Sequence, residues 1–63
     1  MTITLILKNL VPVAYAKNEA EAKEMVIKET FKNSNFCPDT WEWACRLSNI
    51  KAMYSFKEIS NNL

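Results

Sequence analysis

Histidine and glycine are absent from this sequence, and cysteine is scarce. Among 63 residues there are two cysteines, two prolines and no histidine or glycine. Without histidine, neither a Ser-His-Asp nor a Cys-His nucleophile can form within the chain. Two cysteines cannot supply the four ligands of a structural zinc site, and without glycine there is no glycine-rich phosphate loop or dinucleotide-binding turn. The sequence therefore predicts no metal site and no cofactor.

Acidic residues are the remaining candidates for acid–base chemistry. The chain offers Asp39, Glu42 and Glu58 for a carboxylate pair. A domain this small, however, rarely encloses a pocket dry enough for two carboxylates to act as acid and base. We expect solvated surface acids and a protein that is not an enzyme.

The length allows a single small domain, residues 1–63, and no second one. Size scaling gives an accessible surface of about 10,600 Å² unfolded and about 4,200 Å² folded. Burial of the apolar part contributes about 95 kcal/mol, against about 95 kcal/mol of ordering entropy. An isolated monomer would be marginally stable, so either the packing is very good, or a partner or second copy covers part of the apolar surface.

Charge of one sign is not in excess. Eight basic and seven acidic residues give a formal net charge of +1, which creates no strong attraction to polyanions. Along the chain the lysines alternate with glutamates, so no basic stripe is expected and a nucleic-acid partner is disfavoured. The cations that such a partner would use are Lys23, Lys28, Lys32, Arg46, Lys51 and Lys57.

Long hydrophobic runs are also missing. The longest covers residues 3–7, too few to span a bilayer, so no membrane partner is expected. Residues 14–16 have the Ala-x-Ala form of a signal-peptidase site, but Lys8, Asn9 and Pro12 interrupt the apolar run before it and no basic residue precedes that run. We therefore expect mature sequence and a cytoplasmic protein. Both cysteines, Cys37 and Cys45, should be reduced thiols in the cytoplasm and should be buried as small apolar residues.

The first third of the chain predicts a β-hairpin. Residues 2–8 and 11–16 are short, rich in β-branched side chains and alternate between two faces. Side chains expected to share a face are Ile3, Leu5 and Leu7 in the first strand, and Val11, Val13 and Tyr15 in the second. Pro12 favours an edge position, and Asn9 suits a short reversal because asparagine tolerates positive φ.

A helix is predicted over residues 19–32. Asn18 followed by Glu21 has the capping-box spacing, and helix-forming residues continue to Lys32. Lys23 falls on the apolar side, where its stem must lie along the surface.

Residues 40–48 fit two descriptions. As a strand they would place Trp41, Trp43, Cys45 and Leu47 on one face. As a helix they would be capped by Asp39, with Glu42 at N3. We favour the strand, because two tryptophans with a polar residue between them suit a pleat and a hairpin with one helix needs a third strand.

The remaining residues predict little regular structure. A short extended piece should follow Asn49, the capping-box pattern in residues 55–58 predicts one helical turn, and residues 61–63 should fray. The expected fold class is α+β, in the order β-β-α-β: an antiparallel three-stranded sheet with one helix packed on it and a short C-terminal helical turn. A parallel right-handed crossover to the third strand is the alternative.

Aromatic residues are numerous for so small a core. Two Trp, two Tyr and three Phe are difficult to enclose together. The tryptophans either form the core beneath the helix or leave one indole exposed to a partner, and Trp, Tyr and Met are enriched at interface hot spots. The candidate partner-binding residues are Trp41, Trp43, Met53, Tyr54 and Phe56, with Val13 and Tyr15 on the edge strand.

Residues 11–16 (VPVAYA) and 18–22 (NEAEA) together resemble the edge strand and following helix of small phage-encoded host-takeover proteins. The resemblance implies a small intracellular protein that occludes a larger host protein, and it carries no residue role or target to this chain. Our leading hypothesis is a non-enzymatic inhibitor or modulator of viral or mobile-element origin that binds a host protein. It would bind through an aromatic patch around Trp41, Trp43 and Tyr54, or by edge-strand addition at residues 11–16. A small nucleic-acid-associated module and a self-associating structural protein, a homo-oligomer, are the alternatives.

Overall fold

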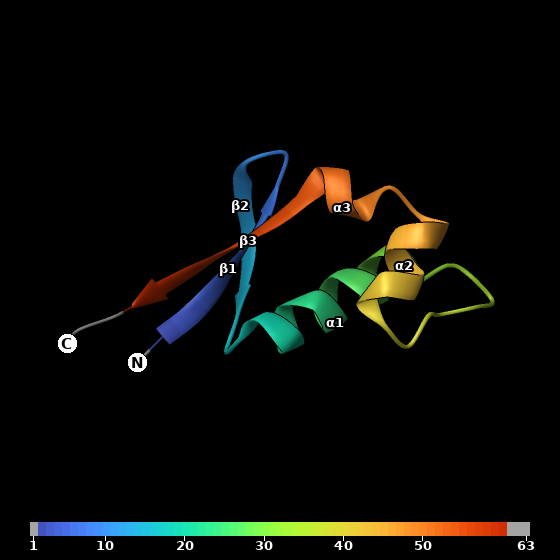
Figure 1. The fold of residues 1–63 in the computed structure, drawn as a ribbon, viewed down its shortest axis with the longest axis horizontal. Coiled ribbons are helices and arrows are strands. Elements are labelled where there is room, and N and C mark those ends of the chain that lie inside the picture. The colour runs from blue at the N-terminus through green and yellow to red at the C-terminus, as the bar shows by residue number, and fades with distance from the viewer. Residues whose placement is uncertain (1, 61–63) are drawn as a thin grey trace.

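The computed structural model describes residues 2–60 and has the expected α+β architecture. Its elements are β1 (Thr2–Lys8), β2 (Val11–Ala16), α1 (Glu19–Thr30), α2 (Trp41–Leu47), α3 (Ile50–Met53) and β3 (Tyr54–Ser60). The sheet has the order β2-β1-β3, and both outer strands are antiparallel to β1 (Figure 1). The predicted antiparallel sheet is therefore confirmed. Since β2 and β3 flank β1, they run parallel to each other without pairing.

The predicted hairpin turn is confirmed, with an unusual residue in it. Asn9 and Leu10 link β1 to β2 with φ angles of 53° and 70°, the two consecutive positive values of a type I′ turn. Asparagine tolerates this conformation, whereas leucine pays a steric cost because its Cβ approaches the following carbonyl. The Asn9 N–H donates to the Met53 carbonyl at 2.8 Å, so the turn is held against the end of α3.

Replacing Leu10 with glycine is expected to stabilise the monomer by about 1 kcal/mol and raise Tm by roughly 4–8 °C. Leu10 is 83% exposed, so little buried area is lost while the left-handed backbone becomes unstrained. Thermal unfolding followed by circular dichroism measures the change. Asn9→Gly is the matched control and should shift Tm less, because asparagine is already tolerated there; a lower Tm for Leu10→Gly would contradict the prediction.

A β-bulge interrupts β2. Ile6 lies opposite Ala14 and Leu7 lies opposite Pro12, so Val13 is the extra residue. Proline is tolerated at this edge position because a bulge already breaks the ladder. The bulge turns Val13 toward the side where Ile6 and Ala14 face the helices, and all three line one groove.

The bulge also changes the predicted faces. Tyr15 lies opposite Leu5, a residue whose neighbours Thr4 and Ile6 are buried under the helices. Tyr15 is therefore on the other side of the sheet from Val13. The prediction that Val11, Val13 and Tyr15 share a face is wrong, since it assumed unbroken alternation.

Helix α1 follows the predicted signals at its start. The Glu21 N–H donates to Oδ1 of Asn18 at 2.8 Å, which confirms Asn18 as the N-cap. The helix ends at Thr30 with Phe31 as C-cap, two residues before the expected end at Lys32.

The favoured prediction for residues 40–48 is wrong, and the helical alternative is confirmed with a different cap. The Trp43 N–H donates to Oγ1 of Thr40 at 3.2 Å, so Thr40 rather than Asp39 caps α2. The alternation of large residues favoured a strand whose polar face would have included Ala44. In the structure Ala44 is instead the fully buried residue of this helix. A period of 3.6 places Trp41 beside it and Trp43 on the outer side.

The third strand lies later in the chain than predicted. Residues 54–60 form β3, where a helical turn was expected over residues 55–58, and α3 occupies the segment expected to be extended. The capping-box pattern was overridden because β3 pairs with all seven residues of β1 and places Tyr54 and Phe56 against the core. Residues 61–63, predicted to fray, lie outside the described residues.

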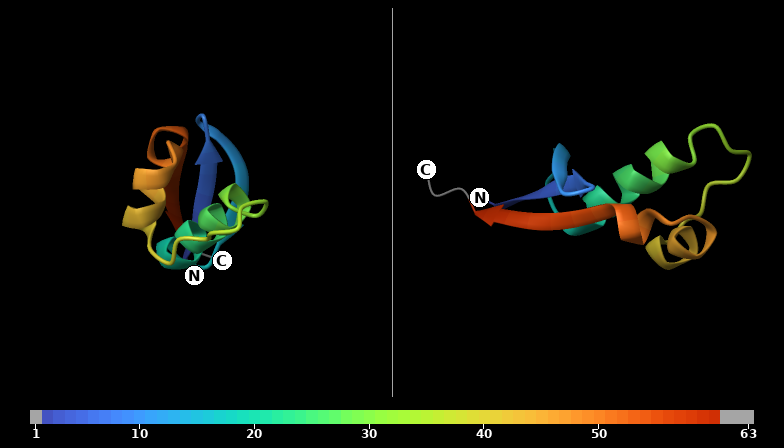
Figure 2. Two further views of the ribbon diagram at one scale, coloured as in Figure 1. Left: turned by 90° about the vertical axis from the view of Figure 1, so that its right-hand side faces the viewer. Right: turned by 90° about the horizontal axis from the view of Figure 1, so that it is seen from above.

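The core lies between the helices and one face of the sheet. Its buried apolar members are Ile6, Ala16, Ala22, Val26, Ile27, Ala44 and Ile50. As Figure 2 shows, the sheet occupies one end of the molecule, and the second half of α1 continues beyond it to meet α2. Within residues 2–60, no helix has the length and hydropathy needed to cross a membrane.

Candidate protein-docking surface

Exposed large apolar side chains gather around the hairpin. Leu10, Val11 and Val13 lie on the turn and on β2. Met25 of α1 is also exposed and lines the same groove as Val13. We call these four residues the hairpin surface. Large exposed apolar patches on small proteins mark binding sites more often than chance.

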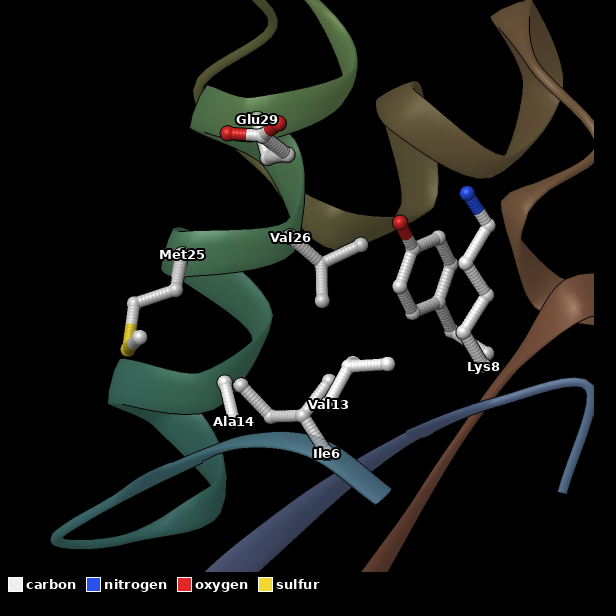
Figure 3. Close-up of a pocket in the computed structure, with 8 residues that line it drawn as sticks. Ile6, Lys8, Val13, Ala14, Met25, Val26 and Glu29 are labelled. Atoms are coloured by element: carbon white, nitrogen blue, oxygen red, sulfur yellow. The ribbon is translucent and has the colours of Figure 1, made fainter. Parts of the chain in front are cut away.

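A groove of about 420 Å³ opens within the hairpin surface. Figure 3 shows Val26 of α1 above Ile6, Val13 and Ala14 of the hairpin, which together make an apolar floor. The groove exists because the bulge adds Val13 to a strand whose neighbour Ala14 is small, leaving space between β2 and α1.

Two charges and one phenol lie at the rim of this groove. Lys8 and Glu29 line its opposite sides (Figure 3). The Lys8 Nζ is 5.9 Å from the centroid of the Tyr54 ring, a cation–π contact. An apolar floor with a few polar rim groups suits an apolar side chain of a partner flanked by polar backbone or side-chain groups.

The hairpin tip extends the docking surface toward α3. Leu10, Met53 and Tyr54 line a second hollow at the turn. Because Asn9 is hydrogen-bonded to Met53, this end of the hairpin is preorganised, which lowers the entropic cost of binding. Of the residues predicted from the sequence to bind a partner, Tyr54 lies between the two hollows: it lines the groove with Val13 and the hollow at the turn with Met53.

The predicted aromatic patch is not brought together. Trp41 packs edge-to-face on Phe56, with ring centroids 5.4 Å apart and an interplanar angle of 67°. Both rings are partly buried against the core, so they hold the fold together. Nζ of Lys23 lies 5.7 Å from the Trp41 ring centroid, which agrees with the prediction that the Lys23 stem lies along the apolar surface.

Trp43 and Tyr15 point to other parts of the surface. Trp43 is 50% exposed on the outer side of α2, one turn before Leu47. Tyr15 is 68% exposed on the far side of the sheet from the groove. Neither residue can contribute to the groove.

Leu10, Val11 and Met25 are exposed apolar residues that were not among those predicted from the sequence for partner binding. Leu10 could have been recognised from the sequence, because it is an apolar residue in a two-residue turn. At that position a leucine cannot reach the core, and it adopts positive φ only with strain. Met25 gave no such signal, because its exposure depends on how α1 crosses the sheet.

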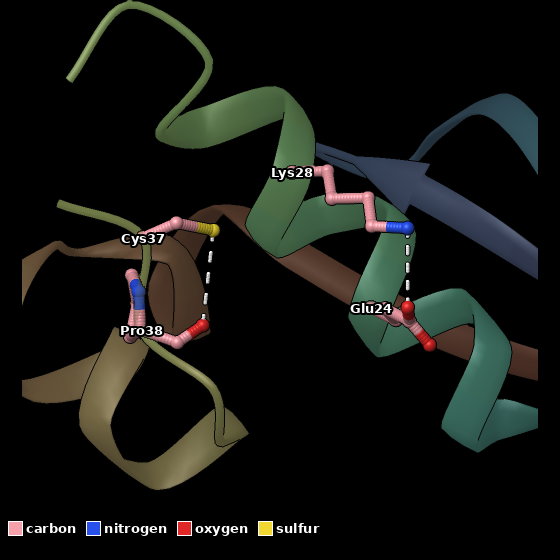
Figure 4. Close-up of polar contacts among 4 residues, drawn as sticks. All are labelled: Glu24, Lys28, Cys37 and Pro38. Atoms are coloured by element: carbon pink, nitrogen blue, oxygen red, sulfur yellow. Dashed lines mark hydrogen bonds and ion pairs between the residues drawn. The ribbon is translucent and has the colours of Figure 1, made fainter. Parts of the chain in front are cut away.

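Basic residues do not form a patch. Lys28 pairs with Glu24 at 3.1 Å, and Lys32 pairs with Glu29 at 2.9 Å. With Lys23 over Trp41, half of the cations considered for nucleic-acid binding already have intramolecular partners (Figure 4 shows Lys28).

The cysteines are free thiols. Cys45 is partly buried against the core, but Cys37 is exposed, so the prediction that Cys37 is buried is wrong. The loop after α1 leaves its Sγ at the surface, 3.8 Å from the carbonyl oxygen of Pro38 (Figure 4). Within residues 2–60, no three His, Cys, Asp or Glu side chains are grouped closely enough to hold a metal ion.

Comparison with protein-family models, with curated proteins and with solved structures finds no match for this chain.

Proposed function

We propose that this is a non-enzymatic protein-binding protein that inhibits or modulates a larger protein by docking through its hairpin surface. The observation that carries this proposal is the apolar groove lined by exposed Val13 and Met25, with exposed Leu10 and Val11 on the same hairpin. A strained leucine adds support, because its positive φ costs stability while its side chain is left 83% exposed at the surface.

The mechanism is steric. An apolar side chain of the partner fills the groove between β2 and α1, and the body of the domain then covers the neighbouring surface of the partner. The resemblance to small phage-encoded host-takeover proteins suggests a phage or mobile-element origin, a host protein as the partner and the host cytoplasm as the place of action.

Edge-strand addition at β2 is the less favourable mode. Pro12 has no N–H to donate, and the bulge at Val13 removes the regular spacing that an added strand needs. Groove filling by one or two apolar side chains, as in helix-in-groove recognition, makes no such demand on the edge.

A selection from a random-peptide library on the immobilised protein tests the proposal. We expect enriched peptides with apolar residues at helical spacing, and we expect Val13→Lys to weaken their binding at least about thirtyfold, since the substitution places a charge in the groove. Trp43→Ala is the matched control at an exposed apolar position outside the groove and should leave the affinity unchanged. Circular dichroism verifies that both variants fold.

Two outcomes would contradict the proposal. Failure to enrich any peptide would argue against protein binding by this domain. Peptides that lose affinity with Trp43→Ala but not with Val13→Lys would move the docking site from the hairpin to α2.

A further inference from the structure

The face of the sheet turned away from the helices is apolar along its centre. On β1, Thr4 and Ile6 are each 3% exposed beneath the helices. Ile3, Leu5 and Leu7 alternate with them and therefore point to the opposite side. An antiparallel sheet with one solvated face normally carries polar residues on that face. β1 instead has the composition of a strand that is covered on both sides.

The pairing of the strands extends this apolar stripe. Ile59 lies beside Ile3, while Lys57 and Tyr15 flank Leu5 on its two sides. None of the apolar residues on this side belongs to the core cluster or packs against it within residues 2–60. We call this side the open face; its large side chains are those of Ile3, Leu5, Leu7, Tyr15, Lys57 and Ile59. Pro12 and Ser55 flank Leu7 on the same side.

The free end of the sheet shows which side is adapted to burial. The β1–β2 pairing stops at Thr4, so Thr2 and Ile3 pair with β3 alone and extend beyond α1 (Figure 1). On this projecting ribbon the helix-side residues are Thr2 and Ser60, which pair with each other and are both polar, whereas Ile3 and Ile59 face the other way. The ribbon is therefore amphipathic, and its apolar side is the open face.

We propose that two copies of the chain pack their open faces together into a four-layer α/β/β/α dimer. Stacked sheets lie about 10 Å apart. A two-fold axis that lies between the sheets and runs parallel to β1 places β2 of one copy over β3 of the other. Residues paired across the three strands of one copy then lie over the same paired residues of the other copy. Leu5 then meets Leu5 of the other copy, and Lys57 lies over Tyr15 of the other copy, where the ammonium can contact the ring.

Charge selects this arrangement over its alternative. An axis across the strands would place β3 over β3 and bring the two Lys57 side chains together. The open face contains no acidic residue that could compensate, because Glu58 points to the helix side. Like charges in a closed interface cost several kcal/mol, whereas the axis parallel to the strands separates them and gives each an aromatic partner.

The exposed area agrees with a second copy. The chain exposes 4935 Å², about 700 Å² more than the roughly 4,200 Å² expected for a compact monomer of this size. A standard interface covers about 800 Å² on each partner. The excess is slightly smaller than that area, so the dimer belongs to the smaller class of interfaces and should dissociate on dilution.

Sedimentation equilibrium tests the dimer. We expect the mass to rise from 7.3 kDa for one chain to twice that value between about 1 μM and about 1 mM. Leu5→Lys should weaken association at least about thirtyfold, as a central substitution does. The same change at the exposed Leu47, on α2, is the control and should leave the mass unchanged. Because residue 5 meets itself at the two-fold axis, an equimolar mixture of Leu5→Lys and Leu5→Glu should recover a dimer that neither variant forms alone.

The outcomes are decisive and separate from those of the proposed function. A wild-type mass of one chain throughout the range, or an undiminished dimer for Leu5→Lys, would overturn the proposal. Failure of the mixture to associate would overturn the axis parallel to the strands. Circular dichroism of each variant shows that it is folded. Peptide binding at the hairpin surface should be unaffected by Leu5→Lys, so either proposal can fail without the other.

Discussion

Ile50→Ala is expected to remove most of the stability of this protein. Ile50 is 0% exposed and is the largest side chain to be so fully buried among the described residues. Deleting the buried methyl groups should cost about 3–4 kcal/mol, against a total of roughly 3–9 kcal/mol for a domain of this length. Urea unfolding followed by circular dichroism should show the midpoint moving toward zero denaturant.

The reason lies in the helix that carries Ile50. α3 is a single turn of four residues without a side-chain N-cap, so it cannot be stable alone. Packing of Ile50 into the core fixes the path of the chain from α2 into β3. Ile50→Val is the matched control and should cost only about 0.5–1.5 kcal/mol. Equal losses for the two variants would show that the site collapses around the cavity and that Ile50 does not have this role.

Trp41→Ala is expected to destabilise the protein by about 3–5 kcal/mol, whereas Trp43→Ala should change the free energy of unfolding by less than about 0.5 kcal/mol. Trp41 loses its edge-to-face contact with Phe56 and the cation–π contact of Lys23. Trp43 is half exposed and makes neither contact. Denaturant unfolding of the two variants, only two residues apart in the sequence, measures the difference.

Fluorescence gives an independent test that requires no unfolding. Trp43→Phe leaves Trp41 as the sole indole, so emission should be blue-shifted and poorly quenched by acrylamide. Trp41→Phe leaves Trp43, and emission should be red-shifted and readily quenched. The reverse order of quenching would mean that Trp41 is the exposed residue and that α2 is rotated relative to the core.

The two proposed binding surfaces meet at β2. The bulge turns Val13 toward the groove, and two residues later Tyr15 faces the open side of the sheet. A regular strand would have placed both side chains on one face. A dimer through the open face would leave the two hairpin surfaces free, so each copy could bind a partner.

The sequence by itself determined the first half of the fold. Alternation in residues 2–8, an asparagine in the turn and the Asn18 cap all act over a few residues, and the structure shows each of them. Residues 11–16 form the predicted second strand, although the bulge at Val13 breaks its alternation. The composition likewise predicted an excess of apolar surface, since a chain this short cannot enclose its large side chains.

Tertiary structure decided the second half and the candidate site. Residues 41–47 and 54–60 carry local patterns compatible with either helix or strand, and the choice depended on which segment could pair with β1 and which could cover α1. The groove depends on a one-residue bulge, and the exposure of Met25 and Trp43 depends on how the helices cross. Such features arise from contacts between segments distant in the chain, which no local pattern of residues specifies.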